Sequence, residues 1–301
     1  MMQSCVDVFQ PYYFGGILGS SKDSKYERID EFLLTDQYTI VNGASSQIEI
    51  YDQKGIFIDC LKQEILRFSN AASESISNSQ VPRKSYKSIA WQFIEMYYAG
   101  YFSAQALLRI SGKSNSRLDQ RIINLLNIKL TKQGLNSWVA IKGSYEINYN
   151  DSSKMILLTK LDEAGGAHAL LWKQFNIFIN EILSDPKIIT LPSDDITCLI
   201  QIVNTLQNGI HANQGHWLSE IRNKVNYRME YDVWHPYGSN RSYYISFKDY
   251  LLKVKEPPHS GPDEIYNAMW AILAICQILV GNLENIKMRS KRSSILQKIL
   301  L

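Results

Sequence analysis

The sequence predicts a mainly α-helical protein that carries inserted β-hairpin elements and a small α/β N-terminal part. Its clearest pattern is a long amphipathic helix over residues 88–109, where apolar side chains recur at helical spacing: Ala90, Phe93, Ile94, Tyr97, Tyr101, Ala104 and Leu108. Further stretches with this spacing follow, and short runs of β type lie between them. The chain has 301 residues, of which 45% are apolar, enough to bury the cores of about two domains.

Residues 1–84 form the predicted α/β part. Two short β-like runs, 38–41 and 47–50, flank an Asn-Gly pair that is typical of tight turns. A helix is expected next, because apolar residues recur at helical spacing over 57–68. The stretch 69–82 is rich in Ser and Asn and has little to bury, which is typical of a linker or mobile loop. We therefore expect a domain boundary near residue 84.

Residues 85–286 are expected to form a helical domain with one β insertion near 137–160. The insertion contains three β-like runs around an Asn-Asp pair, which predict a hairpin: 138–141, 145–149 and 155–159. The other helices of this domain are expected at 117–130, 167–183, 193–208, 213–228 and 262–285. The residues expected in its core include Tyr97, Tyr101, Leu108, Ile272 and Leu279.

The last predicted part is a basic amphipathic tail, 287–301. The formal net charge of the chain is only +3, too small for a field that would by itself indicate nucleic acid. The positive charge is concentrated after Glu284, where no acidic residue occurs. Five basic residues lie there: Lys287, Arg289, Lys291, Arg292 and Lys298. Apolar residues accompany these cations, so the tail is expected either to dock an acidic ligand or partner or to form a plain amphipathic helix.

The cysteines and the hydrophobic segments predict a cytoplasmic protein. Four cysteines lie far apart without a CxxC pair, as expected for small core residues in a reducing compartment. The first residues lack the basic and apolar regions of a secretion signal. The uncharged stretch 265–283 is interrupted by Asn267, Gln277 and Asn282, so we interpret it as a buried helix and expect no membrane span.

The segment 221–237 (IRNKVNYRMEYDVWHPY) is the most informative for function. On a helix, Arg222 shares a face with Asn226, and Asn223 shares a face with Tyr227. Such a group of side chains suits a phosphate, which Arg binds through two hydrogen bonds while Asn and Tyr supply neutral ones. The same residue types also cap helix ends and tie loops to a bundle, so a structural role is the alternative.

Chemistry at this phosphate would need a proton-transfer group, and His235 is the nearby residue that titrates near neutral pH. In this interpretation Arg222 and Arg228 hold the phosphate and His235 is the general acid or base. Four residues would bind the substrate: Asn223, Asn226, Tyr227 and Tyr231. The crowding of tyrosines in this region also favours stacking on an RNA base.

Other motifs predict neither a metal nor a cofactor. The Gly-Lys-Ser run at 112–114 resembles the end of a Walker A motif, but Leu107 replaces the first glycine and a helix precedes the run instead of a strand. His211 and His216 lack a Cys or carboxylate at ligand spacing, so no metal site is expected. We interpret His168, at the start of a helix, as a capping residue in preference to an anion ligand.

The helix end Arg222-Asn223-x-x-Asn226-Tyr227, preceded upstream by the aromatic helix 91–109, resembles HEPN-type proteins of prokaryotic toxin and antiviral defence systems. The hallmark of that family is an Arg, usually followed by a polar residue, with a His a few residues beyond. Arg222 and Asn223 reproduce the first half of this motif, and Asn226 and Tyr227 stand where the His would be expected.

A second register of the motif starts at Arg228, which has six residues between it and His235 but is followed by Met229 instead of a polar residue. The likeness covers residues 86–285 and implies a HEPN-like helical bundle, often dimeric, with metal-independent endoribonuclease activity in active members.

We therefore expect a homodimeric effector of a defence or toxin system that acts on RNA without metal or cofactor. Cleavage would use the RNA 2′-OH as nucleophile, with His235 moving its proton and the two arginines stabilising the phosphorane. The alternative is a non-catalytic interaction subunit of a defence or toxin–antitoxin complex. In that role the bundle binds a protein partner, and the cluster between Arg222 and His235 only holds the helix end in place.

Overall fold

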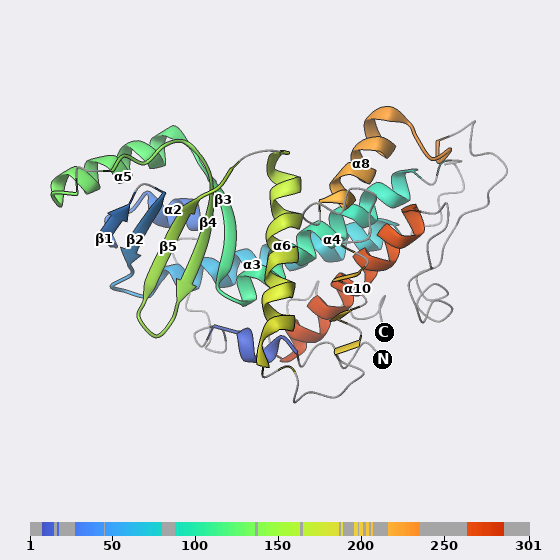
Figure 1. The fold of residues 1–301 in the computed structure, drawn as a ribbon, viewed down its shortest axis with the longest axis horizontal. Helices are drawn as coiled ribbons and strands as arrows, with labels where there is room; N and C mark the ends of the chain where they lie inside the picture. The colour runs from blue at the N-terminus through green and yellow to red at the C-terminus, as the bar shows by residue number, and fades with distance from the viewer. Residues whose placement is uncertain are drawn as a thin grey trace. The chain divides into compact units, whose positions relative to one another are not determined.

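The computed structural model describes residues 8–14, 17, 28–44, 46–79, 88, 90–135, 138–162, 165–186, 188, 196–197, 199–200, 203–204, 206, 216–234 and 264–285 (Figure 1). The elements in chain order are η1 (Gln10–Tyr12), α2 (Ile29–Leu33), β1 (Thr39–Ala44), β2 (Gln47–Tyr51), α3 (Ile56–Ser79), α4 (Ala90–Ile110), β3 (Lys113–Leu118), α5 (Gln120–Lys132), β4 (Gly143–Asn150), β5 (Met155–Lys160), α6 (Gly166–Ser184), α8 (Trp217–Arg228) and α10 (Glu264–Asn285).

The chain divides into two compact units, each assembled from separate segments. The sheet unit comprises Tyr12–Arg67 and Gln105–Ala167. The helical unit comprises Met1–Pro11, Phe68–Ala104 and His168–Leu301. The sequence predicted contiguous parts instead, and the helices α3 and α4 each contribute residues to both units.

In the sheet unit, five described strands form one antiparallel sheet in the order β1-β2-β5-β4-β3 (Figure 1). The central strand β5 pairs with β4 on one side and with β2 on the other. This register sets Ile48 opposite Leu158 and Leu158 opposite Ile147, and all three side chains are buried. Because side chains alternate between the faces of a strand, these pairs build one apolar face of the sheet.

The sheet contradicts the predicted fold class of a mainly α, HEPN-like helical bundle with an inserted β-hairpin. The structure is a helix-rich mixed α/β protein. The hairpin of β4 and β5 is the centre of a sheet that also contains the N-terminal strands β1 and β2. The prediction failed because pairing between β2 and β5 joins segments about a hundred residues apart, and local periodicity carries no signal for such a contact. The strand β3 (KSNSRL) was missed because it is polar and has no apolar alternation.

The linker predicted at 69–82 is also wrong as far as the structure describes it, because α3 continues to Ser79. Ser69, Ala72, Ser73 and Ile76 of this stretch are buried. Small side chains let a helix pack closely, so a segment with little apolar volume can still be buried. The helix begins where Asp52 accepts hydrogen bonds from the backbone N–H groups of Ile56 and Phe57, at 3.2 and 2.9 Å.

Several predicted elements are confirmed. The strands near 38–41 and 47–50, the hairpin around Asn150 and the helices at 88–109, 167–183 and 262–285 are present with small shifts in their ends. The predicted helix 213–228 begins at Trp217, and that at 117–130 begins at Gln120, where Asp119 caps it. Residues 235–250 and the predicted tail 287–301 lie outside the described residues, as does most of the predicted helix 193–208.

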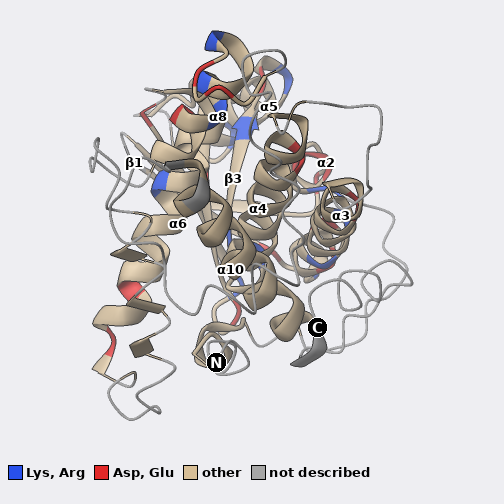
Figure 2. Cartoon of the chain, turned by 90° about the vertical axis from the view of Figure 1, so that its right-hand side faces the viewer, with Lys and Arg blue, Asp and Glu red and all other residues tan. Residues whose placement is uncertain are grey.

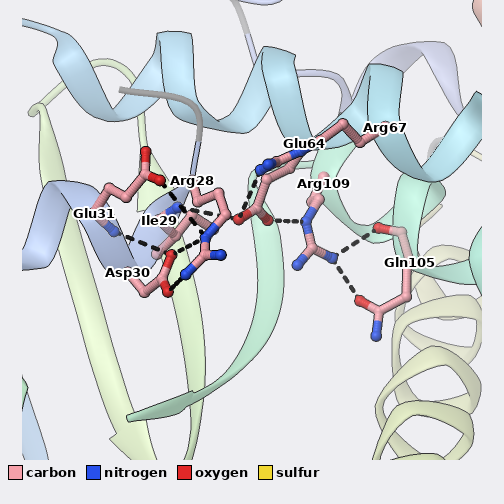
Figure 3. A network of polar contacts seen from close by, with 8 residues as sticks. All are labelled: Arg28, Ile29, Asp30, Glu31, Glu64, Arg67, Gln105 and Arg109. Atoms are coloured by element: carbon pink, nitrogen blue, oxygen red, sulfur yellow. Dashed lines mark hydrogen bonds and ion pairs between the residues drawn. The ribbon is translucent and has the colours of Figure 1, made fainter. Parts of the chain in front are cut away.

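The sheet unit contains a buried ion pair between Arg109, near the end of α4, and Glu64 of α3 (Figure 3). The Arg109 Nε atom donates to Glu64 Oε2 at 2.5 Å, and its Nη1 atom donates to the side-chain oxygen of Gln105 at 2.5 Å. The other Glu64 oxygen accepts from the backbone N–H of Ile29 at the start of α2. A buried charge is tolerated only when paired and hydrogen-bonded, so this network holds three helices together.

The core of the helical unit lies between α4 and α10. A Cβ atom at Gly100 of α4 would lie 3.0 Å from two side-chain carbons of Ile272 of α10, so the two helices approach closely there. Ser103 donates to Cys276 at the same interface, at 3.4 Å.

Of the side chains expected in the core, Tyr97, Leu108, Ile272 and Leu279 are buried and Tyr101 is half-buried. None of the described helices has the length and apolar character needed to cross a membrane.

We predict that Arg109→Leu destabilises the protein by about 3 kcal/mol, because it leaves the Glu64 charge buried with weaker partners. Chemical denaturation measures this cost. The matched control is Arg121→Ala, which removes the same charge from an exposed position of α5. Equal stability of the two variants would show that the ion pair does not hold the sheet unit together.

We also predict that Gly100→Ala lowers the free energy of unfolding by about 1 to 3 kcal/mol, because its Cβ overpacks against Ile272. The second substitution Ile272→Ala should make Gly100→Ala neutral or stabilising, since Ala is the better helix former by about 1 kcal/mol once the space is free. The double-mutant cycle measures this coupling. Additive effects of the two substitutions would contradict the close approach.

Candidate functional site

Arg222 lies within an aromatic group of side chains that we call the Arg222 cluster. All of its members belong to the helical unit and come from three helices: Tyr97, Tyr98 and Tyr101 of α4, His168 and Trp172 of α6, and Arg222, Asn223 and Tyr227 of α8. The helix α8 also carries Lys224 and Arg228, and its basic residues are blue in Figure 2.

Local sequence explains how α8 presents Arg222. Leu218, Ile221 and Val225 recur at intervals of three and four and are buried, which orients the helix against its unit. The helix ends at Met229, whose φ of 55° is left-handed, and the N–H of Glu230 donates back to the carbonyl of Lys224. Arg222 follows the buried Ile221 and is therefore placed at the border of the apolar face.

The Arg222 guanidinium has neutral partners throughout the described part of the chain. Its Nη2 atom donates to the Tyr98 hydroxyl at 2.7 Å, and its Nη1 atom donates to the Asn223 side-chain oxygen at 2.8 Å. The Cζ atom lies 5.9, 5.7 and 5.4 Å from the ring centroids of Tyr97, Tyr98 and Tyr227. The Nε atom is buried and has no acceptor among the described residues. The rings hold the cation in place through cation–π attraction, and two of its five N–H donors are used in the two hydrogen bonds to Tyr98 and Asn223.

His168 lies on the α4 side of the same cluster. Its ring centroid is 4.4 Å from that of Tyr101, and its Nδ1 atom is 3.0 Å from the Tyr97 hydroxyl. The Tyr97 hydroxyl also accepts from Trp172 Nε1 at 3.0 Å. Burial lowers the pKa of His168 below its ordinary value, and the charge of Arg222 lowers it further. The imidazole is therefore neutral near pH 7.

The structure brings together some of the residues that the sequence grouped. Arg222 contacts both Asn223 and Tyr227, and Asn226 is half-buried on the same helix. Arg228 is six residues from Arg222, which corresponds to about 120° around a helix. Its Nη1 atom lies 3.8 Å from Glu230 Oε1, and its side chain is 70% exposed.

Tyr231 belongs to a separate contact on the same segment. Its hydroxyl accepts from Lys224 Nζ at 3.3 Å, and that ammonium group lies 5.7 Å from the ring centroid. His235, the expected proton-transfer residue, lies outside the described residues.

Sequence reasoning missed two features of the cluster. His168 was interpreted as a cap, but its ring bonds to Tyr97 of α4. Tyr97 was expected as a core ring, and the sequence did not indicate that the hydroxyl of its neighbour Tyr98 accepts a hydrogen bond from Arg222. The signal available was three tyrosines within five residues on one helix, which indicates hydroxyl groups that need partners when buried.

Comparison of this chain with protein-family models, with curated proteins and with solved structures finds no match. The function of this chain is therefore inferred from the geometry and chemistry of the Arg222 cluster itself.

The lowered pKa of His168 predicts a pH dependence of stability. The folded state binds this proton less readily than the unfolded state, whose His pKa is about 6.5. The stability linked to His168 is therefore fully present above the unfolded pKa of about 6.5, and it is lost as the pH falls below that value and through the lower folded pKa. Denaturation at pH 5.5 to 7.5 should show this loss in the wild type and a smaller one in His168→Gln. An identical pH slope in both proteins would contradict the shift.

Proposed function

We propose that this protein is an RNA-binding effector of a prokaryotic defence or toxin system, and that the Arg222 cluster binds an RNA phosphate. The observation that carries the proposal is the half-buried Arg222 cation, whose partners within the described residues are all neutral and whose Nε atom has no acceptor among them. A buried donor without an acceptor is costly, and a phosphate oxygen is the acceptor that suits a guanidinium best.

Tyr227 supports RNA as the source of that phosphate. Its side chain is 69% exposed although it is a large aromatic residue, and its ring lies beside the Arg222 guanidinium. An exposed ring next to a cation is the arrangement that stacks on an unpaired base while the cation binds the backbone. The proposed ligand is therefore single-stranded RNA, whose bases are free to stack.

The proposed reaction is cleavage by the neighbouring 2′-OH. Its oxygen forms a bond to phosphorus while a base takes its proton, and the bond to the 5′ oxygen breaks as that oxygen receives a proton. The products are a 2′,3′-cyclic phosphate and a 5′-hydroxyl end. Arg222 would stabilise the charge on the phosphorane, and His235 remains the proposed proton carrier. The resemblance of Arg222-Asn223 to the HEPN motif supports this chemistry, and a metal is not required for it.

A homodimer in the cytoplasm belongs to the same proposal. The described cysteines Cys60 and Cys276 are buried free thiols, which suits a reducing compartment. A twofold-symmetric pair would bring two Arg222 clusters to one RNA, and sedimentation at micromolar concentration measures the association.

We predict that Arg222→Ala weakens binding of a fluorescein-labelled single-stranded RNA by about tenfold or more, because charge-assisted hydrogen bonds contribute about 1.5 to 3 kcal/mol. The control Arg121→Ala removes the same charge from α5 of the sheet unit and should change affinity little. Arg228→Ala tests whether the second arginine belongs to the site. Fluorescence anisotropy measures all three, and equal losses for Arg222→Ala and Arg121→Ala would refute a specific phosphate site.

An RNA cleavage assay distinguishes the proposed enzyme from the non-catalytic alternative. If His235 carries the proton, His235→Ala should bind RNA normally and lose cleavage by about 10² to 10⁴-fold, and EDTA should have no effect. Binding of RNA without cleavage by the wild type would favour the interaction subunit. In that case the interaction subunit should capture a protein partner, and substitutions in the Arg222 cluster should abolish this capture.

A further inference from the structure

A chain of two hydrogen bonds determines the tautomer of His168. The indole nitrogen of Trp172 can only donate, so at 3.0 Å it donates to the Tyr97 oxygen. Burial raises the pKa of the Tyr97 hydroxyl, which therefore keeps its proton. Among the described residues, the acceptor within hydrogen-bond distance of that proton is His168 Nδ1, 3.0 Å from the Tyr97 oxygen, so we assign the proton to this hydrogen bond. Since Nδ1 accepts, the proton of the neutral imidazole is on Nε2.

The surroundings of His168 keep the ring in this neutral form. The groups that face it are Tyr97, Tyr98 and Tyr101 from α4, Trp172 from its own helix, and the cation of Arg222 from α8. None of these carries a negative charge at neutral pH. The ring is half-buried and close enough to the Arg222 cation for that charge to lower its pKa, so its N–H donor belongs to the same cluster.

Arg222 and His168 are positioned by the same two rings. The His168 centroid lies 5.7 Å from that of Tyr97 and 5.9 Å from that of Tyr98. The Arg222 Cζ atom lies 5.9 and 5.7 Å from the same two centroids. The side chains of Arg222 and His168 therefore pack against the same two tyrosine rings of α4, which restricts the motion of one relative to the other.

We infer that His168 is a second phosphate-binding residue, whose Nε2–H donates to an oxygen of the phosphate bound by Arg222, and that Tyr97 and Trp172 are its positioning residues. This inference rests on the proposed function of the Arg222 cluster. A donor that stays neutral binds the phosphate equally well above and below pH 7, and it leaves proton transfer to another group. It thus differs from the role proposed for His235.

Two isosteric substitutions test the donor. The amide nitrogen of Gln can occupy the position of Nε2, whereas the amide of Asn reaches only that of Nδ1. His168→Gln should keep affinity for the fluorescein-labelled single-stranded RNA within about threefold, and His168→Asn should lose about tenfold. Circular dichroism and the thermal midpoint confirm folding of each. Equal affinity of His168→Asn and the wild type would overturn the inference.

Nitrogen NMR of the wild-type protein tests the tautomer without RNA or substitution. Long-range proton–nitrogen correlations should show His168 protonated on Nε2 at pH 7 and titrating below pH 6.5. In Tyr97→Phe the ring loses its donor, so both tautomers should appear and RNA affinity should become weaker at pH 7. A wild-type ring protonated on Nδ1 would overturn the positioning role of Tyr97.

The outcomes distinguish this inference from the proposed function. If Arg222→Ala weakens RNA binding and His168→Asn does not, the phosphate site stands and the role of His168 fails. If Arg222→Ala has no effect, the proposed function fails, and the role of His168 fails with it even when the Nε2 tautomer is observed.

Discussion

The antiparallel pairing of β2 with β5 is the contact on which the sheet unit depends. An isolated two-stranded hairpin is at best marginally stable in water, and this unit contains one hairpin at 39–51 and another at 143–160. Their pairing places Ile48 against Leu158 and Ile50 against Ile156, all fully buried. The resulting face excludes water, and α2, α3 and α4 meet in the same unit around the ion pair of Glu64 with Arg109.

In the helical unit the long helix α4 has two functions. Near its middle, Gly100 and Ser103 allow it to lie against α10 without a gap. One turn earlier, Tyr97 and Tyr98 hold Arg222 and His168. Apolar rings with a single hydroxyl can bury most of their surface and still satisfy a polar neighbour. The cluster therefore has a rigid base, as a binding site requires, and its charge is not cancelled by a carboxylate among its described partners.

Helices were predictable because their apolar spacing is local. The periodicity over 88–109 located α4 to within two residues at its start and one at its end, and the apolar patterns of 167–183 and 262–285 located α6 and α10 at least as well. The strand β3 was not predictable, since KSNSRL becomes a strand only by pairing with β4. The end of α3 was not predictable either, because its Ser-rich sequence has weak propensity and is stabilised by burial of Ala72 and Ile76.

The candidate site also combines contacts that local sequence predicts with contacts that only the tertiary structure shows. The sequence by itself determined that Asn223, Asn226 and Tyr227 lie near Arg222 on one helix, because residues on a helix have a known spacing. The structure decided which of them touch it, since Arg222 contacts Asn223 and Tyr227. Only the tertiary structure decided that His168 joins Arg222, since α6 and α8 bring the two side chains to the same tyrosines of α4 from positions 54 residues apart in the chain. It likewise placed Arg228 beside Glu230. Spacing along a helix is set by covalent geometry, whereas contacts between helices depend on how their side chains pack, which no local pattern records.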